Sequence, residues 1–142
     1  MNKTLEEWIK VYEKKTGEEF KHDERFAFFY LPDKGFCEIA DFGGKMLFVG
    51  QTSGDGHFWR DFTEKLARKL NIKVCGTICI RKESRAYIRL FGYKIDKVDE
   101  ENGLKRYYCT SKNGGWHIMT EFLCENGHKH CYVTWEVKDV EV

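Results

Sequence analysis

The feature of this sequence that most restricts its fold is the alternation of strand and helix patterns between residues 45 and 98. A short strand pattern over 45–49 precedes a loop and a helix whose apolar stripe, spaced at about 3.6 residues per turn, consists of Phe58, Trp59, Phe62, Leu66 and Leu70. An apolar strand over 74–80, a second helix near 82–91 and a strand over 93–98 follow. Helices between consecutive strands are crossover connections, so the pattern predicts at least one parallel strand pair.

The N-terminal third is predicted to contain one helix and then strands. Thr4 and Glu7 have the spacing of a capping box, and the residues that follow place one apolar face on a helix that Gly17 ends. Residues 25–31 are apolar on both faces, which predicts a well-buried strand. A turn over 32–35 leads into a return strand over 36–42.

The last third is predicted to be antiparallel β-structure. Asn102-Gly103 and Asn126-Gly127 carry the Asn-Gly signal of hairpin turns. Aromatic residues make up 15% of the chain, and their periodic positions predict that most of them fill the core. The aromatics assigned to buried faces are Trp8, Tyr12, Phe58, Trp59, Phe62, Trp116, Phe122 and Trp135. The length of 142 residues suits one domain, and the expected fold class is α+β with a mixed sheet.

Composition excludes several classes of protein. Lys and Arg total 24 against 23 Asp and Glu, and the basic residues are scattered, which argues against a nucleic-acid-coating protein. No stretch approaches the roughly 20 apolar residues of a membrane span, and the N-terminal residues lack the apolar core of a signal peptide. The six cysteines are therefore expected to be reduced thiols in a cytoplasmic protein.

Metal binding is not assigned. The ligand types that suit zinc lie in the C-terminal half, but their spacing is not that of a standard finger or ribbon. These residues are Cys109, His117, Cys124, His128, His130 and Cys131. The sequence leaves open whether they bind a metal.

The candidate ligand-binding segment is the loop Gln51-Thr52-Ser53-Gly54-Asp55-Gly56, which leads directly into a helix. The first backbone N–H groups of a helix have no internal acceptor and carry partial positive charge. Glycines allow close approach of a bulky anion, so such a turn can bind phosphate without many basic side chains. The dinucleotide-binding glycine pattern fails because position 59 is Trp, and the Gly-Lys-Ser/Thr of a P-loop is absent.

This loop resembles the Gln/Arg-x-x-Gly-x-Gly/Ala motif of the GCN5-related N-acetyltransferases (GNATs). The order of elements is also similar to that family, and Gly92-Tyr93 stands where the family has Gly-Phe after its second core helix. The resemblance covers about residues 36–98. It implies a short, single GNAT-like domain over 1–142, with a mostly antiparallel twisted sheet, one parallel strand pair, flanking helices and an extra C-terminal hairpin.

The resemblance implies acetyl-CoA as cosubstrate and an N-acetyltransferase that transfers an acetyl group to an amine acceptor by direct attack. It places the pyrophosphate on the loop and the start of the helix, at Gln51, Thr52, Ser53, Gly54, Asp55, Gly56 and His57. It places the pantetheine arm beside Phe48 and Val49, and the acetyl group where the strand ending at Val49 diverges from the strand over 74–80. The acceptor, a small molecule or a protein, stays open.

The family's tyrosine acid corresponds to Ile88 here, one residue from Tyr87, so Tyr87 is the candidate acid. Asp55 adds a carboxylate to the expected phosphate loop. If the strand over 36–42 were the motif strand instead, either Glu38 or Asp41 could act as a base through water. The departures keep a second interpretation open, in which the fold is a non-catalytic interaction module that binds a protein partner as an inhibitor or adaptor.

Overall fold

The structure, a computed structural model, describes residues 2–80, 84–125, 127 and 129–140. Its elements in chain order are α1 (Leu5–Thr16), β1 (Ala27–Leu31), β2 (Gly35–Phe42), β3 (Met46–Gly54), α2 (Gly56–Lys69), β4 (Val74–Ile80), α3 (Ser84–Phe91), β5 (Lys94–Glu101), β6 (Leu104–Thr110), β7 (Trp116–Leu123) and β8 (Lys129–Glu136). None of the described helices has the length and apolar character needed to cross a membrane.

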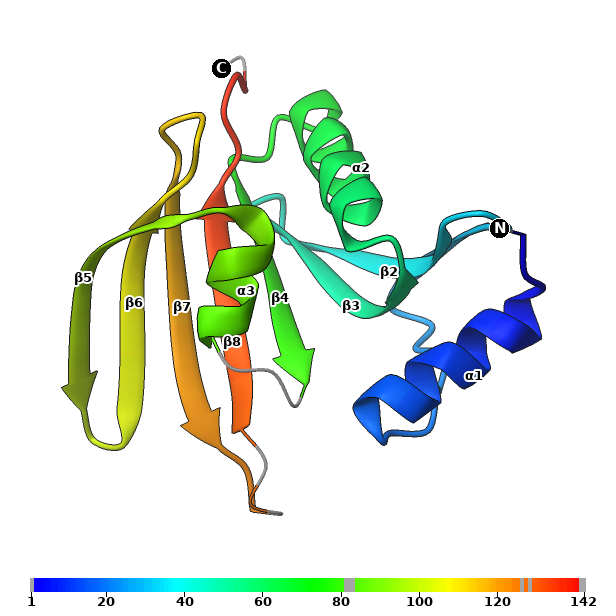
Figure 1. Cartoon of the computed structure of the whole chain (residues 1–142). Coiled ribbons are helices and arrows are strands. Elements are labelled where there is room, and N and C mark those ends of the chain that lie inside the picture. The colour runs from blue at the N-terminus through cyan, green and yellow to red at the C-terminus, as the bar shows by residue number, and fades with distance from the viewer. Residues whose placement is uncertain (1, 81–83, 126, 128, 141–142) are drawn as a thin grey trace.

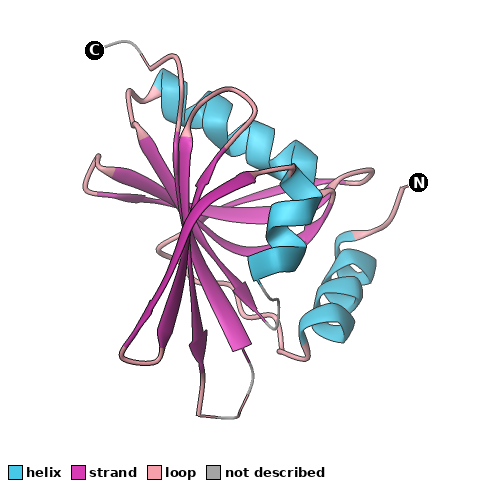
Figure 2. Ribbon diagram, turned by 60° about the vertical axis from the view of Figure 1, so that its left-hand side comes forward, coloured by secondary structure: helices cyan, strands magenta, loops and turns pink. Residues whose placement is uncertain are grey.

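The strands form one eight-stranded sheet in the order β1-β2-β3-β4-β8-β7-β6-β5 (Figure 1). β3 and β4 run parallel, with α2 as the crossover between them, and the other described neighbours are antiparallel. The strands fan out strongly in Figure 2, which shows the twist of the sheet. The expected mixed, mostly antiparallel sheet with one parallel pair is confirmed. The last strand, β8, lies inside the sheet between β4 and β7.

α1 and α2 lie on opposite faces of the sheet, as Figure 1 shows with α2 above β2 and β3 and α1 below them. Tyr12 of α1 packs against Phe36, with ring centroids 5.9 Å apart. Phe62 of α2 packs against Phe29, at 4.9 Å. Phe29 pairs with Cys37 in the ladder, and successive residues of a strand point to opposite faces, so Phe29 and Phe36 face opposite sides.

α3 covers the same face as α2. Tyr93, just after α3, lies 3.7 Å from the His117 ring, and His117 pairs with Trp135 in the ladder. The Trp135 indole N–H donates to Glu64 of α2 at 2.8 Å. The main core therefore lies between the sheet and these two helices.

The capping box of α1 is confirmed. Thr4 Oγ1 accepts from the Glu7 N–H at 3.2 Å, and the Thr4 N–H donates to Glu7 Oε1 at 2.9 Å. Gly17 ends the helix with a φ of 74°. The second core helix is described from Ser84, because residues 81–83 lie outside the described chain.

The segment 51–54, expected as loop, is the end of β3. Thr52 and Ser53 pair with Cys37 and Phe36 of β2, and these backbone hydrogen bonds extend the strand through residues of loop-like composition. The connection between β3 and α2 is Asp55 alone.

Two burial predictions are wrong. In β7, Trp116 is 38% exposed, whereas its neighbours His117 and Met119 are 1% and 0% exposed. The opposite face of the strand is buried because His117, on that face, packs beneath α2 and α3. The strand expected to be buried on both faces is β1, which lies at the edge of the sheet with Ala27 and Leu31 exposed.

Candidate functional site

The site is built on the divergence of the two parallel strands. The β3–β4 ladder consists of Leu47–Cys75, Phe48–Gly76 and Val49–Thr77 and then ends. The Thr77 hydroxyl donates to the Val49 carbonyl at 2.9 Å, which closes the ladder at that point. Beyond it, β3 continues beside β2 and β4 continues beside β8, so the described part of the sheet opens between them.

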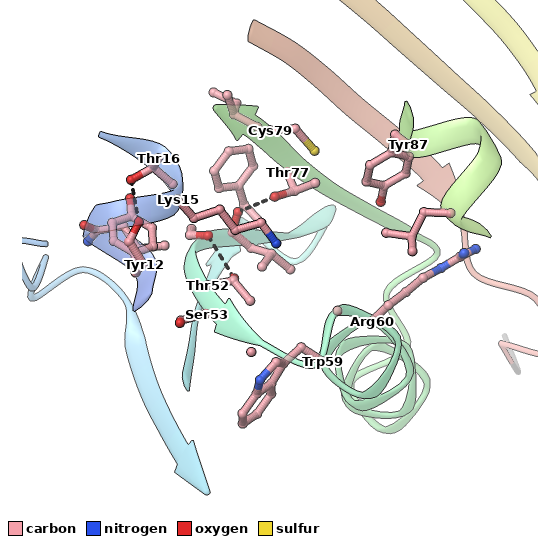
Figure 3. A pocket seen from close by; sticks show the side chains of 18 of the residues that line it. Tyr12, Lys15, Thr16, Thr52, Ser53, Trp59, Arg60, Thr77, Cys79 and Tyr87 are labelled. Carbon is pink, nitrogen blue, oxygen red and sulfur yellow. Dashed lines mark hydrogen bonds between the residues drawn. The ribbon is translucent and has the colours of Figure 1, made fainter. Parts of the chain in front are cut away.

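A cavity of about 770 Å³ fills this opening (Figure 3). That volume is in the range typical of small-molecule sites. Its walls come from the consecutive elements β3, α2, β4 and α3 and from α1 and β8, which are distant from them in sequence. The lining residues are Trp8, Val11, Tyr12, Lys15, Thr16, Phe48, Val49, Gly50, Gln51, Thr52, Ser53, Gly54, Gly56, Trp59, Arg60, Thr77, Ile78, Cys79, Tyr87, Leu90, Phe91, His130 and Trp135.

Most of the residues assigned to the coenzyme from the sequence lie at this cavity. Seven line it, namely Phe48, Val49, Gln51, Thr52, Ser53, Gly54 and Gly56. Asp55 and His57 are outside the lining, and the His57 ring packs against Phe91 at 4.8 Å. The structure thus brings the assigned residues together, and their role in binding stays a prediction.

Asp55 caps α2 instead of facing the cavity. Its Oδ1 accepts from the Phe58 N–H at 3.0 Å, and its Oδ2 lies 3.6 Å from Lys34 Nζ. The Phe58 hydrogen bond, helped by the charge of Lys34, holds the Asp55 pKa below its usual value. The carboxylate therefore satisfies one of the N–H groups that a phosphate at this helix end would use.

The two glycines of the motif differ in their surroundings. Gly54 has a φ of +105°, and a Cβ there would lie 2.0 Å from the Lys34 carbonyl oxygen. The β1–β2 turn packs directly against it, since the Asp55 N–H and the Trp59 indole N–H both donate to that oxygen at 2.9 Å. A Cβ at Gly56 would meet no atom within 4 Å. Gly54 is required by the fold, whereas Gly56 leaves open space at the start of α2.

Glu38 lies outside the cavity lining. It is 1% exposed, and its carboxylate contacts His22 Nδ1 and Gln51 Nε2, each at 3.1 Å. The Gln51 amide also accepts from the Lys21 N–H at 3.1 Å and donates to the Lys21 carbonyl. These contacts hold the segment after α1 against β3. Glu38 touches the cavity lining through Gln51, and its role as a base through water stays a prediction.

Tyr87 lies on the cavity wall and comes from α3, as Figure 3 shows. The neighbouring Ile88, at the position of the family's tyrosine, packs in the core and is not part of the wall. Burial raises the Tyr87 pKa well above its usual value, with Tyr93 as the next contribution. Tyr87 is therefore protonated at neutral pH, which is the state that a proton donor needs.

Arg60 of α2 reaches the cavity wall under α3. Its guanidinium carbon lies 4.6 Å from the Phe91 ring centroid and 4.9 Å from that of Tyr93. Its Nη2 contacts His117 Nε2 at 2.9 Å, and its Nε lies 3.3 Å from Glu64 Oε2. The polar pattern of α2 gave no signal for this, because the contacting rings belong to distant segments.

His117 is a buried neutral imidazole. Burial, with a contribution from the Arg60 charge, lowers its pKa to about 3. Since a guanidinium is only a donor, Nε2 accepts and the proton is on Nδ1. This arrangement removes His117 from the candidate zinc ligands. The described residues contain no group of three or more metal-ligating side chains, and His128 lies outside them.

No pattern in the sequence indicates that α1 forms a wall of the cavity. Trp8, Tyr12 and Lys15 reach the cavity because α1 packs on the sheet face opposite α2, and the Ser53 hydroxyl donates to the Trp8 carbonyl at 2.8 Å. A pattern within one helix indicates which residues are apolar, but not which distant strand gap the helix covers.

Comparison with known proteins gives the fold. No protein-family model matches the chain, and no curated protein matches it in sequence. Among solved structures, Ard1 from Thermoplasma volcanium is similar in fold, with a TM-score of 0.52 at 10% sequence identity. The match covers 98% of this chain and 97% of that chain. The fold is GNAT-like.

Proposed function

We propose that the protein is an acetyl-CoA-dependent N-acetyltransferase that acts on an amine acceptor in the cytoplasm. The observation that carries the proposal is the opening between β3 and β4 beyond Val49–Thr77, which forms a cavity through the sheet with Tyr87 on its wall. The similarity in fold to Ard1, an acetyltransferase, supports it.

The residues present fit this coenzyme. The edge of β3 beyond Val49 is not paired with β4 in the described chain, so its backbone groups are positioned to pair with an extended pantetheine arm. Gly56, where a Cβ would meet no atom within 4 Å, would let a diphosphate approach the start of α2. No carboxylate belongs to the described lining, which suits an anionic ligand. The coenzyme would supply an acetyl thioester.

The chain's own contribution would be to hold the acceptor beside the thioester and to manage protons. Positioning of two reactants lowers the activation free energy by up to about 7–11 kcal/mol in favourable cases. As the amine nitrogen bonds to the carbonyl carbon and the carbon–sulfur bond breaks, the Tyr87 hydroxyl would give its proton to the sulfur. The proton lost by the amine passes to solvent, from which Tyr87 is protonated again, so the step needs no further reactant.

A second candidate is a non-catalytic module that binds a protein partner. The observation in its favour is Asp55, whose carboxylate already occupies a helix N-terminal N–H group and is paired with Lys34. In this case the helix end is satisfied within the chain, and no diphosphate is needed there.

Titration with acetyl-CoA, by calorimetry and by thermal unfolding, separates the two. A ligand at 100 times its dissociation constant stabilises the folded state by about 2.7 kcal/mol. Binding together with release of free thiol in the presence of a primary amine supports the enzyme. Binding without turnover over a range of amines favours the module. No binding at millimolar coenzyme refutes the enzyme and also any phosphate-binding role of the loop before α2.

A further inference from the structure

Two cysteines lie directly opposite each other in the sheet. Cys79 of β4 pairs with Cys131 of β8 in the antiparallel ladder between these strands. Directly opposite side chains point to the same face of a sheet. Cys131 belongs to the main core, and Cys79 packs against it. In the described ladders, every other paired cysteine lies opposite residues of other types.

This register brings the two thiols close to the geometry of a disulfide. Directly opposite residues of an antiparallel pair have Cα atoms about 4.5–5.5 Å apart and Cβ atoms about 4.5–5.5 Å apart. A disulfide joins residues whose Cα atoms are about 4.4–6.8 Å apart and whose Cβ atoms are about 3.5–4.5 Å apart. The two Cβ atoms therefore need to approach each other by up to about 1 Å, and the strands can stay paired. Neither cysteine forms a disulfide in the structure.

The two thiols differ in how solutes reach them. Cys131 is 0% exposed, whereas Cys79 is partly exposed and belongs to the wall of the cavity. Figure 3 shows Cys79 on β4 and Tyr87 on α3 at this cavity. A small oxidant that enters the cavity can therefore reach Cys79 first. Redox-sensing cysteines have this arrangement, in which an accessible thiol lies next to a second cysteine that resolves it.

The other cysteines lack this combination. Cys37, Cys75 and Cys109 are buried, and burial raises the thiol pKa of Cys37 and Cys75 to about 12 and that of Cys109 to about 11. Since the thiolate is the reactive form, these three are poor nucleophiles. Cys124 is partly exposed, but it follows the end of β7 and lies outside the described ladders.

We propose that Cys79 and Cys131 are a peroxide-sensitive pair, which closes reversibly into a disulfide between β4 and β8. The Cys79 sulfur attacks a hydroperoxide and the O–O bond breaks. Cys79 becomes a sulfenic acid, and the leaving oxygen departs with the thiol proton as water or an alcohol.

The disulfide forms in a second step. The Cys131 sulfur bonds to the Cys79 sulfur, the S–O bond breaks, and the hydroxyl group leaves as water with the proton of Cys131. The buried Cys131 can act because the ladder holds it directly opposite the sulfenic acid. The two thiols lose two electrons in total, which the hydroperoxide accepts. A dithiol reductant restores both thiols, as expected for a transient, redox-sensing disulfide in a reducing compartment. The inference is independent of the proposed function.

Hydrogen peroxide tests this on the full-length protein. After treatment, the remaining thiols are alkylated and the chain is digested without reduction. We expect two of the six thiols to be lost and dithiothreitol to restore them. Trypsin leaves Cys75 and Cys79 in one peptide, so fragmentation of the linked peptide shows which of them is joined to Cys131.

The variant is Cys131→Ala, and its matched control is Cys75→Ala, since both thiols are 0% exposed. In Cys131→Ala the linked peptide should be absent, and the sulfenic acid of Cys79 should accumulate and be trapped by dimedone. Cys75→Ala should react like the unsubstituted chain, with its linkage at Cys79. If Cys131→Ala does not fold, the linkage mapped in the unsubstituted chain decides. No loss of thiols, linkage of Cys79 to another cysteine, linkage mainly between chains, further oxidation of Cys79 without linkage, or an equal effect of the two variants would overturn the proposal.

Discussion

The two glycines at the start of α2 should respond to substitution in opposite ways. In Gly54→Ala, the new Cβ would lie 2.0 Å from the Lys34 carbonyl oxygen in a backbone with φ +105°. Backbone strain of this kind costs about 1–3 kcal/mol. Displacement of the oxygen would also weaken its two hydrogen bonds, from the Asp55 N–H and the Trp59 indole, worth about 1 kcal/mol each. We therefore expect the free energy of unfolding to fall by about 3–5 kcal/mol.

In Gly56→Ala the Cβ enters open space at the first residue of α2, so the free energy of unfolding should stay level or rise by up to about 1 kcal/mol. Urea unfolding followed by tryptophan fluorescence measures both. A Gly54→Ala protein within about 1 kcal/mol of the unsubstituted chain would refute the packing argument. Gly56, and not Gly54, is then the position to enlarge in a test of coenzyme approach, because Gly56→Leu should weaken acetyl-CoA binding while the fold remains.

Three further outcomes are expected. The folded-state pKa of His117 is about 3, below its usual 6.5, so the unfolded chain binds more protons between these two pH values. The free energy of unfolding should therefore fall as pH drops from about 6.5 towards 3, by up to about 1.4 kcal/mol per pH unit. His117→Gln should flatten this dependence in urea unfolding at several pH values, and an unchanged slope would assign it to other groups. Tyr87→Phe should lower the acetyl-transfer rate about 10²–10⁴-fold with coenzyme affinity retained. The control Tyr93→Phe changes a residue outside the lining and should not lower the rate. Equal rates for Tyr87→Phe and the unsubstituted enzyme would exclude the proton-donor role of Tyr87. Glu38→Gln should cost about 1–3 kcal/mol of stability through its contacts with His22 and Gln51 and change the rate little; a rate loss without a stability loss would restore Glu38 as a base.

Local patterns were sufficient for part of the fold. The capping residues of α1 are neighbours in sequence, and the helix between two strands led directly to the parallel pair β3–β4. The extent of β3 was wrong because Gln51 and the residues after it have loop-like composition, and their strand conformation depends on pairing with β2. Backbone pairing is indifferent to side-chain type, so composition gave no sign of it.

Side-chain faces and the site depended on distant contacts. The alternation of residue types in β7 is compatible with burial of either face of the strand. The buried face is the one that carries His117, which Arg60 contacts from α2. The motif glycines and Tyr87 were found at the cavity because the resemblance placed them on elements that the crossover brings together. Lys15 was not found, because the packing of α1 across the strand gap follows from the tertiary fold.

The central position of β8 has a consequence for how the chain matures during synthesis. β4 pairs with β3 on one edge and with β8 on the other, while β5, β6 and β7 form a meander that joins the rest of the sheet through β8. During synthesis the sheet is therefore expected to form first as two separate parts, one ending at β4 and the other made of β5, β6 and β7. The two parts can join only after β8 has been made, because Val74 of β4 pairs with Glu136 of β8. During that interval the inner edge of β4 is an exposed template for wrong pairing, and it is where a folding chaperone would be most useful.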